Sequence, residues 1–559
     1  MPEMEEGHHM DHHSMDREGI ADASNTSHSS PSATSETLHP VAHSSKHHHG
    51  MPILQMQLTP EERLYWLNYS TTTYFTTPSL SRSSLYVHLA LYIAPFVLLY
   101  PVVLVLYKIH HEMYLPALTV HSVLVVLSAF SFYIFEASID DLFPLSAFST
   151  MTIVLFSSTA HWFLAVVASS YSYLKADVGR DYSELEDDRV SLDSPTSTLR
   201  DSSLCELFEL DDQQVHAGPV QSSNDATRQF QSSAIFRFFI KFPALQNLAE
   251  KCGRVAISLS AVANWAMFAY FFIYFSTGIA KYSLYGQDKD MFNLLAHFIK
   301  GGVFFVLGLV TFARYCGAFK QKGWAWNHVF VTNSSRNSLW SSWFSLGTWT
   351  IIWPIQAGPG AKDLQHVSIA FIFIGCGLCG VLLERKLADW RTGKALESLS
   401  LVTDNKSLCR VIAANLGFSP SPFQLVTIFW MGDLMSQHAQ ESVLATEIHK
   451  QWGNMFLYAC AFRVITYIYF MLVPVNTSTM TKPLMPMSEV IVSFGFIAGG
   501  LIFMDSCSPV LHLMEYYGYS PMFSFKITLG VVTLIMAWEM SVFTIRDRLS
   551  KPSKNFSAI

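Results

Sequence analysis

Residues 85–107 read LYVHLALYIAPFVLLYPVVLVLY, a run without Asp, Glu, Lys or Arg. The hydrocarbon core of a bilayer is roughly 30 Å thick, and about 20 helical residues cross it. The run has this length and this apolar character, so it predicts a transmembrane helix.

Similar runs follow along the rest of the chain. They lie at about 115–136, 146–171, 257–279, 292–313, 338–356, 365–384, 421–436, 453–474, 488–504 and 523–543. With the first run they predict an all-α, polytopic transmembrane bundle of about eleven spans.

The composition agrees with a membrane protein. Of the 559 residues, 50% are apolar and 14% are charged, and the mean hydropathy is +0.27. Soluble globular proteins carry about a quarter charged residues, so a soluble enzyme is excluded. The net charge of -7 gives no sign of a nucleic-acid partner, and the lipid bilayer is the predicted partner.

Composition also divides the chain into segments. Residues 1–60 are rich in His and Ser and predict a disordered N-terminus. Residues 61–171 form a predicted three-span N-terminal membrane domain, and residues 236–545 a predicted eight-span C-terminal one. The acidic, Ser-rich stretch 172–235 between them predicts a disordered linker that cytoplasmic kinases could phosphorylate. Residues 546–559 are a basic tail.

The basic loops predict the orientation. Most Lys and Arg residues fall in the linker, in the loops on the same side as the linker, and in the tail. Cytoplasmic loops carry the excess of Lys and Arg, so the C-terminus is predicted to be cytoplasmic and the N-terminus lumenal or extracellular. The sequon at Asn68 would then be open to glycosylation. The predicted location is the plasma membrane or the endomembrane system (endoplasmic reticulum, Golgi or vacuole).

Four histidines fall within the predicted spans. They are His88, His121, His161 and His297. At about 1.5 Å per helical residue, His88 and His297 share one depth, and His121 and His161 share another. Neutral imidazole ligates haem iron, so these pairs are candidate ligands of two stacked b-type haems that carry electrons across the membrane. The alternative is that each imidazole hydrogen-bonds a neighbouring helix.

A second group of histidines lies near the ends of later spans, on the N-terminal side of the membrane. It comprises His366, His438 and His449. Imidazoles beside carboxylates suit Cu, Zn or Fe, so the group is a candidate lumenal metal site. Helix capping and loop hydrogen bonds are the alternative.

Three other features bear on function. The segment HHMDHHSMD near the N-terminus could hold Cu or Zn. Arg463 lies inside a predicted span and needs a partner, which Asp433 or Glu489 could supply. Cys376 and Cys379 form a CxxC inside a span, where packing is the simpler role.

Several stretches resemble the C-terminal domain of the fungal Ytp family of multi-pass membrane proteins. They are ARYCGAFKQKGWAWN (313–327), KDLQHVSIAFIFIG (362–375), MGDLMSQHAQ (431–440), IHKQWG (448–453), FRVITYIYFMLVP (462–474) and GFIAGGLIFMDS (495–506). The first three spans resemble the domain of unknown function that precedes it in this family.

The N-terminal spans also resemble the ascorbate-type two-haem transmembrane cytochromes b, in which four histidines of a helix bundle bind the haems. The resemblance implies haem ligation by His88, His121 and His161, with His297 as the candidate fourth ligand. No nucleotide or flavin motif is present, so electrons would come from a separate donor.

Three hypotheses follow from these features. The first is a transmembrane electron carrier or metal reductase of the cytochrome b type. The second is a haem-free metal-handling protein or transporter that uses the lumenal histidines. The third is a non-catalytic membrane scaffold with a regulated linker.

Overall fold

The structure is a computed structural model. It describes residues 39–42, 50–143, 151–187, 241–287, 290–318, 368, 371–383, 386, 422–437, 440–472 and 485–550. Most of the His-rich N-terminus, the greater part of the predicted linker, and the predicted span 338–356 lie outside these residues.

The described residues are helical and include no strand, so the predicted all-α class is confirmed. In chain order the helices are η1 (Ile53–Gln55), α1 (Pro60–Leu67), α2 (Arg82–Ala94), η2 (Pro95–Leu99), α3 (Tyr100–Lys108), α4 (Tyr114–Glu136), α5 (Met151–Asp187), α9 (Pro243–Tyr282), α10 (Asp290–Tyr315), α14 (Phe423–Ser436), α15 (Val443–Leu472), α17 (Ser488–Asp505), α18 (Ser508–Tyr517) and α19 (Pro521–Leu549).

Within the described part, 7 helices are long and apolar enough to cross a membrane. They are Arg82–Lys108, Tyr114–Glu136, Met151–Lys175, Pro243–Tyr282, Asp290–Tyr315, Ser488–Asp505 and Pro521–Leu549. Each contains most of one predicted span. Of the other predicted spans, 421–436 corresponds to α14, which has only 14 residues. The span 453–474 overlaps α15, which has 30 residues and ends at Leu472.

The outward faces of these helices are apolar. Phe130, Phe156 and Leu534 are 65%, 71% and 72% exposed. A helix at a water interface turns polar residues outward, whereas large apolar side chains face outward where lipid is the solvent. The surface therefore fits a bilayer.

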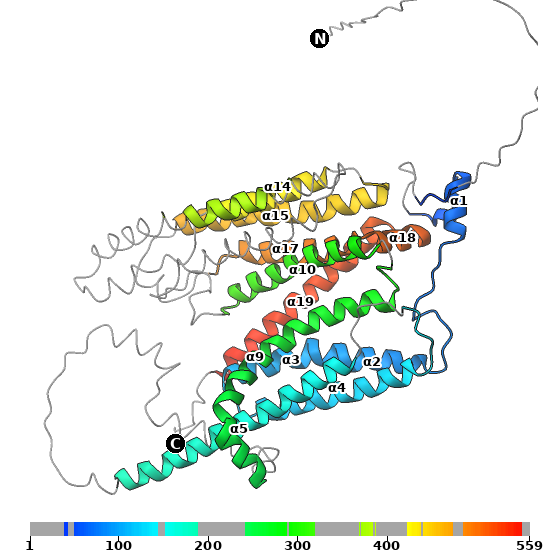
Figure 1. Ribbon diagram of the computed structural model, residues 1–559. Helices are drawn as coiled ribbons and strands as arrows, with labels where there is room; N and C mark the ends of the chain where they lie inside the picture. The colour runs from blue at the N-terminus through cyan, green and yellow to red at the C-terminus, as the bar shows by residue number, and fades with distance from the viewer. Residues whose placement is uncertain are drawn as a thin grey trace, which may run out of the picture.

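Four helical segments pack into a unit that we call the N-terminal bundle: α2–η2–α3, α4, α5 and α9. Its core is largely aromatic, and Phe96 stacks on Phe271 with ring centroids 5.0 Å apart. Figure 1 shows α9 (green) lying beside the blue and cyan helices. In sequence α9 belongs to the predicted C-terminal domain, whereas in space it completes the N-terminal bundle.

Helix α5 is longer than the predicted third span. It continues past residue 172 to Asp187, so helix extends into the stretch predicted to be a disordered linker. The rest of that linker lies outside the described residues.

Two prolines interrupt the first span. η2 is a π-helical turn that starts at Pro95, and Pro101 follows near the start of α3. Because Pro101 has no N–H, it cannot donate to the carbonyl of Val97 one turn earlier. That carbonyl instead accepts a hydrogen bond of 2.8 Å from the Trp538 indole of α19. The sequence of α3 thus creates a docking point for the second half of the molecule.

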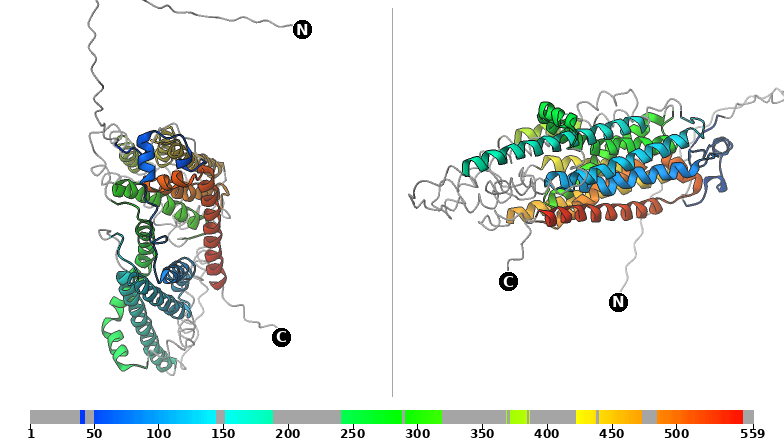
Figure 2. Two further views of the ribbon diagram at one scale, coloured as in Figure 1. Left: turned by 90° about the vertical axis from the view of Figure 1, so that its right-hand side faces the viewer. Right: turned by 90° about the horizontal axis from the view of Figure 1, so that it is seen from below.

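The C-terminal bundle consists of α10, α14, α15, α17 and α19, with α17 buried along much of its length. Figures 1 and 2 show these helices running roughly side by side with those of the N-terminal bundle. α10 and α17 approach closely at glycines: a Cβ on Gly500 would lie 2.7 Å from the Gly301 carbonyl oxygen. Small residues at contact points are typical of helix pairs in membranes.

The short helices α1 and α18 lie together at one end of the long helices, called the α18 end below (Figure 1). Thr59 caps α1 through reciprocal bonds with Glu62. The Tyr65 hydroxyl lies 3.2 Å from Nδ1 of His512 in α18. These contacts fix the segment that enters the first span.

Candidate functional site

His121 of α4 and His161 of α5 meet around one aromatic ring in the N-terminal bundle. The ring centroid of Tyr100 lies 4.8 Å from that of His121 and 6.4 Å from that of His161. Phe96 packs edge-on against His121 at 4.5 Å. The structure therefore brings these two predicted residues together.

Both imidazoles are buried and have unused hydrogen-bonding capacity. His121 is 1% exposed and His161 is 2% exposed. Among the described residues, neither ring nitrogen of His121 has a hydrogen-bond partner, nor does Nε2 of His161. A buried polar atom normally finds a partner, so these three nitrogens make the pair a candidate ligand-binding position.

Asn264 of α9 joins this group. Its amide nitrogen donates to the Ser260 carbonyl at 2.9 Å. The Asn264 side chain also contacts the Tyr114 hydroxyl at 3.1 Å, while Tyr100 donates to the Asn264 carbonyl at 3.0 Å. The network ties α9 to α3 and α4 beside the two histidines.

His88 lies elsewhere in the same bundle. It is 1% exposed, and its Nδ1 is 2.9 Å from the Ser128 hydroxyl. Its ring neighbours include Phe132 at 5.1 Å and Tyr282 at 6.4 Å. Residues 243–282, which form the fourth helix of the bundle, include no histidine.

His297 does not lie beside His88. It belongs to α10 in the C-terminal bundle, where its ring centroid is 6.2 Å from that of His449 on α15. Depth alone predicted the His88–His297 pairing, and depth does not report which helices are neighbours. The structure thus moves His297 from the predicted haem set to the neighbourhood of the predicted metal set.

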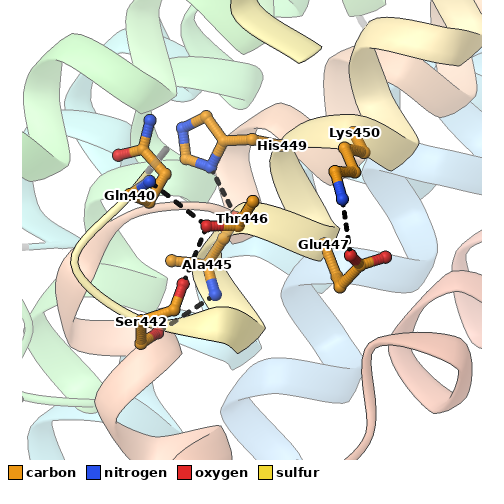
Figure 3. Close-up of polar contacts among 7 residues, drawn as sticks. All are labelled: Gln440, Ser442, Ala445, Thr446, Glu447, His449 and Lys450. Atoms are coloured by element: carbon orange, nitrogen blue, oxygen red, sulfur yellow. Dashed lines mark hydrogen bonds and ion pairs between the residues drawn. The ribbon is translucent and has the colours of Figure 1, made fainter. Parts of the chain in front are cut away.

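The predicted metal group is described only in part. His449 is 4% exposed, whereas His366 and His438 lie outside the described residues. Figure 3 shows the His449 ring beside the Gln440 side chain at the start of α15. No group of three or more potential metal ligands of the His, Cys, Asp or Glu type occurs among the residues the structure describes.

The predicted partner of Arg463 is found. Its Nε lies 3.0 Å from Oε1 of Glu489, and Glu489 is 0% exposed. The Thr466 hydroxyl donates to the same carboxylate oxygen at 2.7 Å. The arginine therefore belongs to a buried ion pair that ties α15 to α17.

Two residues of the His121–His161 site were not predicted. Asn264 lies in the predicted span 257–279, and a polar amide within that apolar run is a signal that could have identified it. Tyr100 carried no comparable signal, because aromatic residues occur throughout the first span.

The fold and these buried sites define a polytopic α-helical membrane protein built from two packed bundles, with histidine sites in both. Residues 270–547 match the family described as Protein YTP1-like, C-terminal, and residues 68–171 match a domain of unknown function, DUF2427. The chain belongs to the YTP1-like family of fungal membrane proteins, as the stretches quoted above predicted.

Two relatives illustrate the family. The chain is 36% identical to the "Uncharacterized membrane protein YCR061W" of Saccharomyces cerevisiae, over 93% of this chain and 92% of that protein. It is 30% identical to the "Uncharacterized membrane protein C3B8.06" of Schizosaccharomyces pombe, over 49% of this chain and 55% of that protein. No solved structure matches the chain. The family descriptions name no cofactor, and they bring no support for the resemblance to cytochromes b.

Proposed function

We propose that this protein is a membrane electron-transfer protein that binds one b-type haem between His121 and His161. The observation that carries the proposal is the set of three buried imidazole nitrogens without a hydrogen-bond partner among the described residues. Two histidines on different helices are a common axial ligand set for haem in helix bundles.

The surroundings of the two histidines suit a porphyrin. Phe96 and Tyr100 pack against His121, and Phe271 stacks on Phe96. Aromatic rings of this kind pack against a flat macrocycle. Phe96 and Tyr100 are buried and packed against the histidine, so haem binding would require them to move. The donor set and the apolar lining suit the group.

A single haem replaces the two that the sequence predicted. The second predicted pair needs His88 and His297, and these side chains lie in different bundles. The proposal therefore assigns His88 a hydrogen-bonding role and places the haem at the level of Tyr100.

The chain's own residues have defined tasks in this proposal. His121 and His161 would hold the iron, and Tyr100 fixes the Asn264 backbone of the neighbouring helix through its hydroxyl. When bound, haem supplies a one-electron iron couple. The apolar core excludes water from the ligands. The donor is a separate protein or small molecule, and a metal ion is the proposed acceptor.

The proposed topology places the His-rich N-terminus on the lumenal or extracellular face and the basic tail in the cytoplasm. Kinases of the cytoplasm would then reach the Ser-rich linker. The membrane is the plasma membrane or one of the endomembrane system.

Haem content is the test. The full-length protein, purified in detergent from cells supplied with haem, should contain about one haem b per chain by the pyridine haemochrome assay. His121→Ala and His161→Ala should abolish binding, and His88→Ala should retain it. Loss of haem in all three variants, or in none, would overturn the assignment of ligands. Protein that elutes as a monodisperse species without haem would overturn the function itself.

A further inference from the structure

Glu539 carries a carboxyl group inside the membrane that the haem proposal does not use. It lies in α19, within the predicted span 523–543, and it is the only charged residue between Lys526 and Arg546. At about 1.5 Å per helical residue, Glu539 lies about 10 Å along the helix from Arg546, where the basic end of α19 begins. Ionisable residues at such a position are costly and tend to mark function.

The packing of α19 turns Glu539 toward the end of α10. Met536 is buried in one cluster with Phe312 of α10, and Glu539 follows Met536 by three residues on the same side of the helix. Further along the helix, Arg546 donates to the Cys316 carbonyl at the end of α10 at 3.2 Å. Glu539 therefore lies between two points at which α19 contacts α10.

The preceding residue, Trp538, ties the same turn of α19 to the N-terminal bundle through the Val97 carbonyl. Residues 85–107 of that bundle contain no Asp, Glu, Lys or Arg. Glu539 is thus placed where α19 contacts both bundles, and the first span offers it no charged side chain.

The charged groups around Glu539 are committed to other partners. The Arg546 guanidinium pairs with the Asp547 carboxylate at 2.7 Å. On α15 and α17, which also pack against α19, Arg463 and Glu489 pair with each other.

The Cys316 thiol of α10 is uncharged at neutral pH, because burial, and then the Glu539 carboxyl, raise the pKa of this thiol to about 12. The Oε2 atom of Glu539 is itself buried, and it has no hydrogen-bond partner among the described residues.

These surroundings favour the neutral acid. An ionised carboxylate in an apolar interior is costly unless a cation is paired with it, and a group without that partner takes up a proton instead. Glu489 provides the contrast within the same molecule, because its partner Arg463 compensates the charge.

We propose that Glu539 is a proton-binding site in the membrane interior, which holds a proton at neutral pH and exchanges it with water at the C-terminal end of α19. Because α19 contacts both bundles at this point, release of the proton would place a negative charge at their junction. The site is independent of the haem proposal, since it shares no residue with His121 or His161.

The first test is the infrared spectrum of the full-length protein in lipid vesicles at pH 7. A protonated carboxyl group in apolar surroundings gives a C=O stretching band that ionised carboxylates lack. Glu539→Gln should remove one such band, and Glu539→Asp should retain one. The matched control Glu447→Gln, at an exposed carboxylate paired with Lys450, should leave the bands unchanged.

The band should also shift in heavy water, because the proposal requires the proton to exchange. An acid-band region in Glu539→Gln identical to that of the native chain would overturn the proposal. A Glu539 band that does not shift in heavy water would overturn the exchange.

The second test uses dicyclohexylcarbodiimide, an apolar reagent for protonated carboxyl groups. The carboxyl proton passes to a carbodiimide nitrogen, the carboxyl oxygen bonds to the central carbon, and the adduct rearranges to an N-acylurea without a leaving group. An ordinary exposed glutamate is protonated in about 1 of 500 molecules at pH 7. Labelling of Glu539, measured by mass spectrometry of its peptide, should therefore exceed that of Glu447 by about a hundredfold.

Equal labelling of the two carboxyl groups would overturn the proposal. Glu539→Gln should elute from size exclusion as the native chain does and should bind the same amount of haem. These two measurements separate the loss of a proton site from misfolding and from failure of the haem proposal.

Discussion

At the scale of single residues, the buried ion pair between Arg463 and Glu489 should have the largest effect on the free energy of unfolding. Removing one partner of a buried pair leaves an uncompensated charge and costs about 3–5 kcal/mol. Glu489→Ala should therefore lower the thermal stability of the detergent-purified protein sharply. Glu447 also pairs with a cation, Lys450, but that pair is 40% and 48% exposed, and Glu447→Ala should cost less than about 1 kcal/mol. Equal effects of the two substitutions would contradict a buried pair.

A second residue-scale prediction concerns pH. The Tyr74 hydroxyl donates to Asp141 at 2.6 Å, and this bond, helped by the Phe143 N–H and Lys281, holds the pKa of Asp141 below its ordinary value. A carboxyl group whose pKa is lower in the folded chain than in the unfolded chain stabilises the fold at pH values above its pKa in the unfolded chain. This contribution is lost as the pH falls through its pKa in the folded chain.

Tyr74→Phe should thus lower the melting temperature by about 2 °C at pH 7. The difference from the native chain should shrink as pH falls below about 4. Tyr458→Phe removes an exposed hydroxyl and serves as the control. A difference that grows on acidification would have the wrong sign for this interaction.

For charged and histidine residues in the membrane, the sequence predicted either the partner or the depth of the side chain. Arg463 needed a buried carboxylate, and Glu489 supplies it. His121 and His161 were expected at one depth, and the structure places both around Tyr100. His297 was expected beside His88 and lies beside His449. The sequence predicts the depth of a residue in the membrane, but it does not predict which helices are neighbours in the membrane plane.

At the scale of elements, glycine decides how closely α10 and α17 approach. A Cβ on Gly301 would lie 2.6 Å from the Gly500 carbonyl oxygen, whereas a Cβ on Gly302 would meet nothing within 4 Å. Gly301→Leu should therefore separate the helices and cost about 1–3 kcal/mol, and Gly302→Leu should be nearly neutral. Thermal unfolding of the two variants measures the contrast, and similar melting temperatures would show that the helices do not touch there.

The limits of the helices were predictable because hydropathy is a local property. The predicted runs 85–107, 115–136 and 488–504 differ from the observed helices by a few residues. The assignment of α9 to the N-terminal bundle was not predictable, since the linker separates it from its neighbours in sequence. Only packing, such as the bond from Tyr100 to the Asn264 carbonyl, shows where it belongs.

At the scale of the whole molecule, the glycosylation sequon at Asn68 tests the proposed orientation. Asn68 is exposed just after α1, and the proposed orientation places it outside the cytoplasm. The protein from its native membranes should shift in gel mobility after treatment with an N-glycosidase, and Asn68→Gln should remove the shift. A second sequon, Asn476-Thr477-Ser478, falls on the predicted cytoplasmic side. Glycosylation of Asn476 with none at Asn68 would reverse the proposed orientation.

The two bundles form one molecule through α19, whose Trp538 indole binds the carbonyl that Pro101 leaves free in the first span. This contact lies one turn or less from Phe96 and Tyr100, the rings that pack on His121. Residues 96–101 therefore contribute both to the contact between the bundles and to the proposed haem site. A change in the oxidation state of a haem bound there would occur close to the second bundle.

Haem binding by His121 and His161 is measured by the dithionite-reduced minus oxidised absorption spectrum of the purified full-length protein. The native chain should show the narrow α-band of a low-spin, bis-histidine haem b, and this band should be lost when either His121 or His161 is replaced by Ala. A folded protein that shows no haem bands after expression with ample haem would contradict haem binding.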